Sequence, residues 1–216
     1  MPDPRWTLPN TITVARIATC PIIALLALSE GAGFRLAAFV LFVLAALSDL
    51  WDGYLARKHG WITEIGKLLD PIADKVLLIA TLLPIYIISH RGDALAPLPW
   101  WGPLSGWVVG IIIGRELLVT ALRGLAVRRG FVLSAGQSGK YKAFLQNLFL
   151  GAALLWYPLV QLGAARGWSG SFWVFWQGFH GVFLGVALLV ALALTVFSLL
   201  DYLWSWRHLR RKALGH

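Results

Sequence analysis

Long apolar runs, separated by short segments that hold most of the charged side chains, occupy nearly the whole chain of 216 residues. A helix that crosses the hydrocarbon core of a bilayer needs about 20 consecutive apolar residues, and the runs reach that length. Only 13% of the residues are charged, whereas soluble domains have roughly 25%. The sequence therefore predicts an all-α integral membrane protein.

The runs predict a single membrane-embedded domain over residues 1–216, with a bundle of six transmembrane helices. The expected helices span about 11–29, 33–58, 66–89, 104–129, 138–162 and 173–205. Asn10 is expected to cap the first helix, with Pro9 in the turn before it. Residues 2–9 are predicted to form a short segment along the membrane interface.

Basic residues gather on one side of this predicted topology. The segments on the side of the N-terminus contain Arg57, Lys58, Lys67, Arg123, Arg128, Arg129, Lys140, Lys142, Arg207, Arg210, Arg211 and Lys212. The opposite segments contain Arg35, Arg91 and Arg166. The positive-inside rule then places both termini in the cytoplasm, as for a multi-pass protein of a bacterial inner membrane. The net charge of +9 is juxtamembrane, so anionic lipid headgroups, and not nucleic acid, are the expected partners.

Four aspartates lie at the facing, cytoplasmic ends of the second and third predicted helices. Helical spacing puts Asp49 and Asp52 on one face, and Asp70 and Asp74 on one face of the next helix. Asp49 and Asp74 lie about 12 Å inside the helix ends, at the depth of lipid headgroups. Four converging carboxylates repel one another unless a cation lies between them, and oxygen ligands suit Mg²⁺ or Mn²⁺. The pattern predicts a site for two divalent metal ions that acts in phosphoryl transfer.

These acids have three alternative interpretations. They could form a buried salt-bridge network with Arg57, Lys67 and Lys75, but four acids exceed what helix packing needs. A calcium loop is excluded because the ligand spacing and the terminal glutamate are missing. A divalent-metal transporter remains an alternative, although transporter sites tend to lie near the membrane midplane at broken helices.

The acids belong to a longer pattern with fixed spacing. It reads Asp49-x2-Asp52-Gly53-x2-Ala56-Arg57-x8-Gly66-x3-Asp70-x3-Asp74. This pattern resembles the signature of the CDP-alcohol phosphatidyltransferases, without a departure. The resemblance implies a six-helix, homodimeric membrane enzyme with a cytosol-facing site for two divalent metal ions. Members of the family transfer a phosphatidyl group from a CDP-linked lipid to an alcohol and release CMP.

The resemblance also implies roles for individual residues. Asp49, Asp52 and Asp70 would be metal ligands, and Asp74 would be the general base for the acceptor hydroxyl while also contacting the second metal. The CDP-lipid pocket would include Asp52, Gly53, Ala56 and Arg57, with Asn10 and Thr13 near the diphosphate.

Basic residues in the second half of the chain suggest a phosphorylated acceptor. Arg115 and Arg123 lie eight residues apart on one predicted helix, and Lys140 and Lys142 follow a polar loop. Phosphate is well matched by Arg and Lys. A structural pair of Arg115 with Glu116, or with an acid of a neighbouring helix, is the alternative for Arg115. The segments around these residues resemble the phosphatidylglycerophosphate synthase branch of the family, although Ala143 stands where that branch typically has threonine. The resemblance implies CDP-diacylglycerol and sn-glycerol 3-phosphate as substrates, with phosphatidylglycerol, inositol phosphate or serine as alternative acceptors.

Overall fold

The computed structural model describes residues 7–61, 63–91, 97–128 and 137–213. Its helices are α1 (Leu8–Leu28), α2 (Ala32–His59), α3 (Glu64–His90), α4 (Gly106–Arg128), α5 (Gln137–Arg166) and α6 (Ser171–Ala213). The only β-type pairing among these residues is an isolated bridge between Leu98 and Gly102. The predicted all-α fold with six helices is confirmed.

The start of α1 differs from the sequence prediction. The helix begins at Leu8, with Pro9 in its first turn, where proline is tolerated because the first N–H groups have no partner within the helix. Thr7 occupies the N-cap position, so the assignment of Asn10 as the cap is wrong. Of the predicted interfacial segment 2–9, residues 2–6 lie outside the described residues, and residues 8 and 9 belong to α1.

One face of α1 organises the N-terminal half of the bundle. Besides Pro9, its buried residues recur every three or four positions: Asn10, Thr13, Arg16, Cys20, Ile23 and Ala27. Helical periodicity puts them on the face that packs against both α2 and α3. The polar members all lie in the first half of the helix, and the apolar members follow. The same face therefore provides a polar site at one end and a hydrophobic contact at the other.

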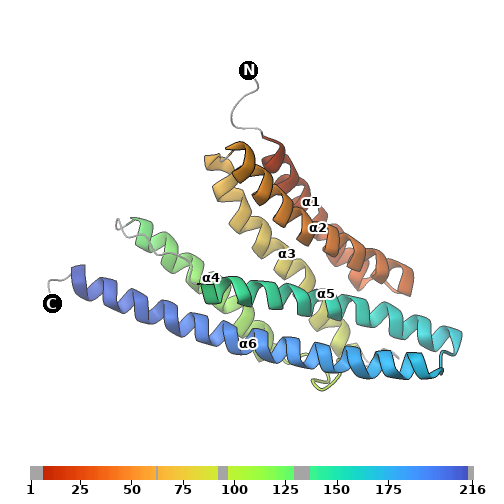
Figure 1. Ribbon diagram of the computed structural model, residues 1–216. Coiled ribbons are helices and arrows are strands. Elements are labelled where there is room, and N and C mark those ends of the chain that lie inside the picture. Colours follow the sequence, from red (N-terminus) through yellow and green to blue (C-terminus); the bar gives the residue numbers. More distant parts are fainter. Residues whose placement is uncertain (1–6, 62, 92–96, 129–136, 214–216) are drawn as a thin grey trace.

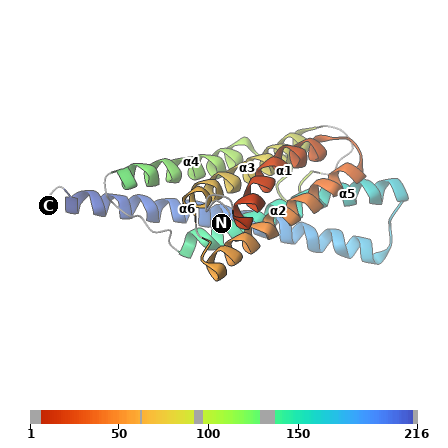
Figure 2. The same ribbon diagram turned by 90° about the horizontal axis from the view of Figure 1, so that it is seen from above.

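The remaining helices form a second group. The antiparallel helices α5 and α6 lie side by side and cross the α1–α3 group obliquely, as Figures 1 and 2 show. Helix α5 packs against α2, and α4 packs against α6 and α3. Buried side chains from both groups, among them Phe42, Leu82, Phe149 and Leu188, form one continuous hydrophobic core.

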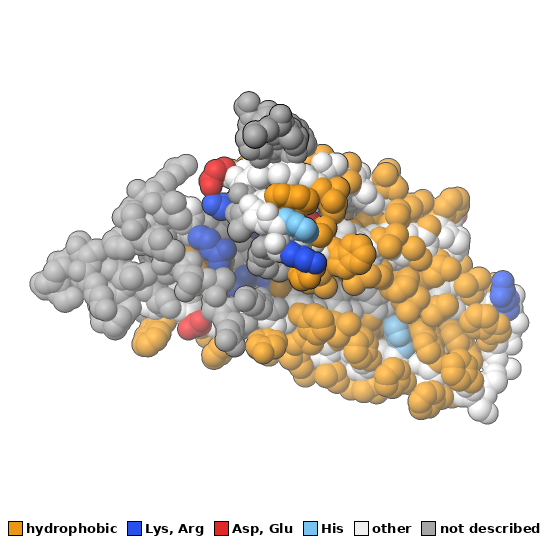
Figure 3. Space-filling view, turned by 45° about the horizontal axis from the view of Figure 1, so that its top comes forward, with side chains coloured by type: hydrophobic (Ala, Val, Ile, Leu, Met, Phe, Trp, Pro, Cys, Tyr) orange, Lys and Arg blue, Asp and Glu red, His pale blue; other side chains and the backbone are white. Residues whose placement is uncertain are grey.

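Hydrophobic side chains also cover much of the outer surface, and they dominate the face in Figure 3. In the described part of the chain, five helices are long and apolar enough to cross a membrane: α1, α2, α3, α5 and α6. Helix α4 contains Arg115, Glu116 and Arg123 and is not among the five. An apolar surface of this extent is unfavourable in water, so the chain is a multi-pass membrane protein.

Candidate active site

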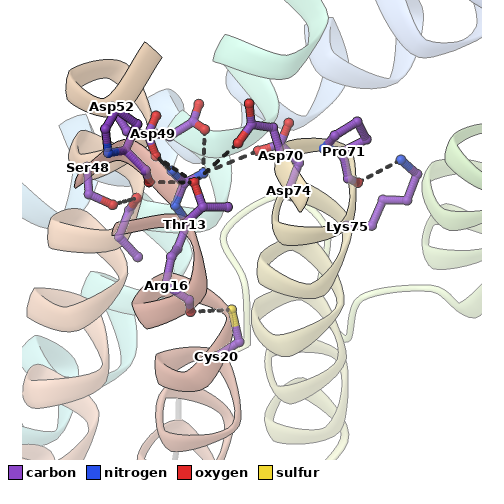
Figure 4. A network of polar contacts seen from close by, with 12 residues as sticks. Thr13, Arg16, Cys20, Ser48, Asp49, Asp52, Asp70, Pro71, Asp74 and Lys75 are labelled. Carbon is purple, nitrogen blue, oxygen red and sulfur yellow. Dashed lines mark hydrogen bonds and ion pairs between the residues drawn. The ribbon is translucent and has the colours of Figure 1, made fainter. Parts of the chain in front are cut away.

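The four aspartates of the sequence pattern meet at one end of the α1–α3 group. Asp49 and Asp52 lie near the end of α2, and Asp70 and Asp74 lie in the first half of α3. Figure 4 shows Thr13 and Arg16 of α1 between the acids of α2 and those of α3. The predicted convergence of these side chains from two helices is what the structure contains.

A buried arginine is the cation at the centre of these acids. The guanidinium of Arg16 forms ion pairs with Asp49 and Asp52, and its Nη1 lies 3.7 Å from Oδ1 of Asp74. The Arg16 side chain has no exposed surface, whereas the carboxylate side chains are 5% (Asp52), 40% (Asp49) and 62% (Asp74) exposed. One guanidinium therefore offsets part of the repulsion among the acids, from the buried Asp52 to the accessible Asp74.

Thr13 links the acids of the two helices. Its Oγ1 lies 3.2 Å from Oδ2 of Asp52 and 3.2 Å from Oδ1 of Asp70, and 3.1 Å from the carbonyl oxygen of Pro9. A hydroxyl donates one proton, so these oxygens share one donor. Thr13 thereby connects α2 and α3 through α1.

Asn10 fixes the start of α3 in the same region. Its Nδ2 donates to Oγ1 of Thr63 at 2.9 Å, and the Thr63 side chain caps α3 by accepting from the Gly66 N–H at 3.0 Å. A Cβ at Gly66 would lie 2.8 Å from Oδ1 of Asn10, closer than normal contact. The glycine in the pattern therefore allows the close approach of α1 to α3.

A cleft of about 200 Å³ opens beside the acids. It is lined by Pro9, Asn10, Asp52, Gly53, Ala56, Trp61, Thr63, Gly66, Lys67 and Asp70. Four of the six residues that the sequence assigns to the CDP-lipid pocket are among them. Thr13 does not line the cleft but contacts Asp52 and Asp70, which do. The side chain of Arg57 lies outside the described residues.

The residues assigned to the acceptor phosphate lie on other helices. Arg115 of α4 donates from Nη1 to Oε1 of Glu116 at 2.9 Å and from Nη2 to Oγ of Ser198 on α6 at 3.0 Å. Lys142 of α5 pairs with the same Glu116 and is buried. The structure thus brings Arg115 and Lys142 together around one glutamate. Arg123 is exposed on α4, and the side chain of Lys140 lies outside the described residues.

The residue that sequence reasoning missed is Arg16, whereas Glu116 was expected from the sequence only as a structural partner of Arg115, a pair that the structure contains. The salt-bridge alternative named Lys67 and Lys75, but Lys67 pairs with Glu64 at 2.7 Å and Lys75 donates to the carbonyl oxygen of Pro71 at 2.8 Å. Arg16 fills that role instead. A charged residue inside an apolar run is costly and usually functional, and Arg16 carried this signal in the sequence.

The chemistry of the acidic cluster suits a hard divalent cation, because its four aspartates offer carboxylate oxygens. As they stand, however, no three Asp, Glu, His or Cys side chains in the described ranges are gathered closely enough to hold a metal ion. The carboxylates of Asp49 and Asp52 are turned toward Arg16. To bind a metal ion, Asp49 and Asp52 would have to give up part of their contact with the Arg16 guanidinium and turn carboxylate oxygens toward the metal.

A family model for the CDP-alcohol phosphatidyltransferases matches residues 6–197, a range that includes the four aspartates as well as Arg115 and Lys142. The chain belongs to this family. The match covers all six helices except the last part of α6.

Individual proteins of the family are similar to this chain over most of its length. The chain is 40% identical over 152 residues to a "probable phosphatidylglycerophosphate synthase" of Mycobacterium tuberculosis, covering 68% of this chain and 66% of that protein. That coverage is just under two thirds of the relative's length. The chain is 39% identical over 162 residues to a CDP-diacylglycerol–glycerol-3-phosphate 3-phosphatidyltransferase of Bacillus subtilis, covering 69% and 77%. A Pseudomonas fluorescens protein of the same description is 33% identical over 208 residues, covering 94% and 92%.

Proposed function

We propose that the chain transfers the phosphatidyl group of CDP-diacylglycerol to sn-glycerol 3-phosphate, giving phosphatidylglycerophosphate and CMP. The observation that carries this proposal is the convergence of four motif aspartates beside a cleft in a membrane protein of this family. The descriptions of the relatives from Bacillus subtilis and Pseudomonas fluorescens support glycerol 3-phosphate as the acceptor.

Two divalent ions, Mg²⁺ or Mn²⁺, would be held by Asp49, Asp52, Asp70 and Asp74. When bound, they would offset the negative charge of the diphosphate and of the departing CMP. Arg16 remains a fixed positive charge beside the same acids. Because its side chain is fully buried where α1 packs against α2, Arg16 would keep the Asp49 and Asp52 carboxylates oriented.

The cleft residues would bind the nucleotide end of the lipid. The cleft is lined in part by the small residues Gly53, Ala56 and Gly66, so a diphosphate can approach the helix backbones closely. Asn10 and Thr13 bring polar groups of α1 to the same place. Because these residues lie on three helices, binding of the CDP part depends on the packing of α1 against α2 and α3.

Asp74 would act as the general base for the acceptor hydroxyl. Its side chain is 62% exposed, and the 3.7 Å separation from Arg16 makes this the longest of the three Arg16 contacts. An accessible carboxylate can accept a proton from a bound alcohol, whereas Asp52 is enclosed. The acceptor oxygen would then displace CMP directly, without a covalent enzyme intermediate.

Arg115 and Lys142 would contact the phosphate of the acceptor, with Arg123 and Lys140 as further candidates. Two cations that share Glu116 retain an excess of positive charge. A phosphate dianion is a stronger partner for them than one carboxylate. Binding of the acceptor would therefore loosen the contacts with Glu116.

The purified protein, assayed for CMP release from CDP-diacylglycerol with a panel of acceptors, tests the proposal. Glycerol 3-phosphate should give the highest kcat/KM, above phosphatidylglycerol, inositol phosphate and serine. Product with another alcohol but none with glycerol 3-phosphate would overturn the acceptor assignment. Absence of CMP with every acceptor, together with metal flux in reconstituted vesicles, would favour the transporter alternative.

We further propose that the protein works as a homodimeric single-domain enzyme in the bacterial inner membrane, with the acidic cluster facing the cytoplasm. The excess of basic residues near that end supports the orientation. A cysteine placed at the exposed Lys67 in a Cys20→Ala background should react with a membrane-impermeant maleimide in inverted vesicles only. Reaction in right-side-out vesicles would contradict the orientation. Cross-linking in native membranes tests the dimer, and recovery of the monomer alone would contradict it.

A further inference from the structure

Trp61 occupies a tightly held turn at the end of α2. Gly60 follows the last residue of the helix with φ of 67°, a left-handed conformation that favours glycine. The N–H groups of Gly60 and Trp61 both donate to the carbonyl oxygen of Ala56, the latter at 2.9 Å. These bonds fix the direction in which the chain leaves the helix, and with it the position of the indole.

The indole of Trp61 lies at the candidate active site. Trp61 lines the same cleft as Asp52, Gly53 and Ala56, and 41% of its surface is exposed. The imidazole of His59 stacks on it, with ring centroids 4.7 Å apart and an interplanar angle of 23°. His59 thus supports the indole from one side, while part of the ring remains accessible to a ligand.

We propose that Trp61, backed by His59, is the platform on which the pyrimidine ring of the CDP part stacks. This inference rests on the proposed function, which brings a nucleotide to the cleft. Asp52 lies about 10 Å from the end of α2 at 1.5 Å per residue, a separation of the order of one nucleoside. A diphosphate beside Asp52 therefore directs the ribose and base toward the turn that holds Trp61.

Stacking also explains why an aromatic residue suits this position. Bases present a flat face to aromatic side chains, and such contacts contribute strongly to the binding of nucleotides that lack base pairs. A tryptophan near the headgroups could instead serve only as a membrane anchor. Trp51, on the same helix, is 73% exposed and is not among the residues that line the cleft. It provides the matched comparison.

Calorimetric titration of the full-length protein with CMP, in detergent and with Mg²⁺, tests the inference, because this soluble ligand does not depend on membrane anchoring. Trp61→Ala should weaken CMP binding about tenfold and raise KM for CDP-diacylglycerol by a similar factor, with kcat unchanged. Trp61→Phe should retain most of the affinity. Trp51→Ala should bind CMP as the wild type does.

Three results would overturn the proposed stacking on Trp61. They are wild-type CMP affinity in Trp61→Ala, an equal loss of CMP affinity in Trp51→Ala, and a wild-type protein that does not bind CMP. Turnover separates this inference from the proposed function. If the wild type released no CMP with any acceptor but its CMP binding still required Trp61, the reaction assignment would fail and the platform would stand. If turnover were normal and Trp61→Ala had no effect, only the platform would fail.

Discussion

The two charge clusters differ in balance and in setting. In the acidic cluster of α1–α3, three of the four carboxylates lie beside one guanidinium, the fourth, Asp70, contacts Thr13, and the group borders a cleft. In the basic cluster of α4–α6, Arg115 and Lys142 share Glu116. Each cluster contains one residue of the minority charge: Arg16 among the acids and Glu116 among the bases. Negative charge is in excess in the first cluster and positive charge in the second.

This difference separates what each cluster can bind. The excess of carboxylates attracts divalent cations and, through them, a diphosphate, whereas the excess of cations attracts a phosphate directly. The single opposite charge keeps each site intact when no ligand is bound, because an unpaired buried charge is strongly destabilising. We therefore assign the CDP-lipid to the acidic cluster and the acceptor to the basic one.

The largest expected effect is on the general base. Asp74→Asn should lower kcat by about 10²–10⁴-fold, because the amide cannot accept the proton of the acceptor, while CMP affinity stays close to that of the wild type. Steady-state CMP release and CMP titration measure the two quantities. Glu64→Gln is the control, since it removes an exposed carboxylate from the same helix, and its kcat should be unchanged. Near-normal turnover in Asp74→Asn would remove Asp74 from the mechanism.

The next effect concerns the cation within the acids. Arg16→Met should reduce the free energy of unfolding by about 3–5 kcal/mol in the absence of metal, because Asp52 remains buried without its partner. Added Mg²⁺ should raise the melting temperature more in this variant than in the wild type. Thermal unfolding in detergent, with and without Mg²⁺, measures both.

Arg35→Met provides the matched control, because Arg35 is also buried but contacts the carbonyl oxygen of Ala27 instead of the aspartates. It should show no additional stabilisation by Mg²⁺. If Arg16→Met melted at the wild-type temperature and responded to Mg²⁺ in the same way, the assignment of Arg16 as the counter-charge of the acids would be wrong.

A smaller effect is expected where α1 meets α3. Gly66→Ala should destabilise the protein by about 1–3 kcal/mol, because its Cβ would displace Asn10 from Thr63, and it should also weaken CMP binding. Gly110→Ala on α4, where no atom lies within 4 Å of the added Cβ, should be neutral or slightly stabilising. Melting temperatures of the two variants make the comparison, and equal temperatures would contradict the close contact.

The sequence predicted the acidic cluster better than its surroundings. Spacing within α2 and α3 was enough to place Asp49 with Asp52 and Asp70 with Asp74, because helical periodicity is local. The partner of these acids was not predictable in this way, since Arg16 lies 33 and 36 residues before Asp49 and Asp52. Such contacts depend on which helices pack together, and the spacing of residues along the chain does not predict that packing.

The start of α1 and the basic cluster teach the same lesson. Asn10 has the side chain of a helix cap, but the contact with Thr63 on another helix takes precedence. Arg115 and Lys142 were two of the four basic residues that the sequence assigned to the acceptor phosphate, whereas the sharing of Glu116 between them depends on how α4 meets α5. Local patterns thus predicted the residue types of both clusters, and tertiary packing determined their pairing.

The most direct test of the division between the clusters is the ratio of kcat/KM for glycerol 3-phosphate to that for glycerol. Lys142→Met should lower this ratio about 10- to 100-fold, since a charge-assisted contact with the phosphate is lost, with KM for CDP-diacylglycerol unchanged. A wild-type ratio in this variant, or a parallel rise in the KM values of both substrates, would contradict the assignment of the basic cluster to the acceptor.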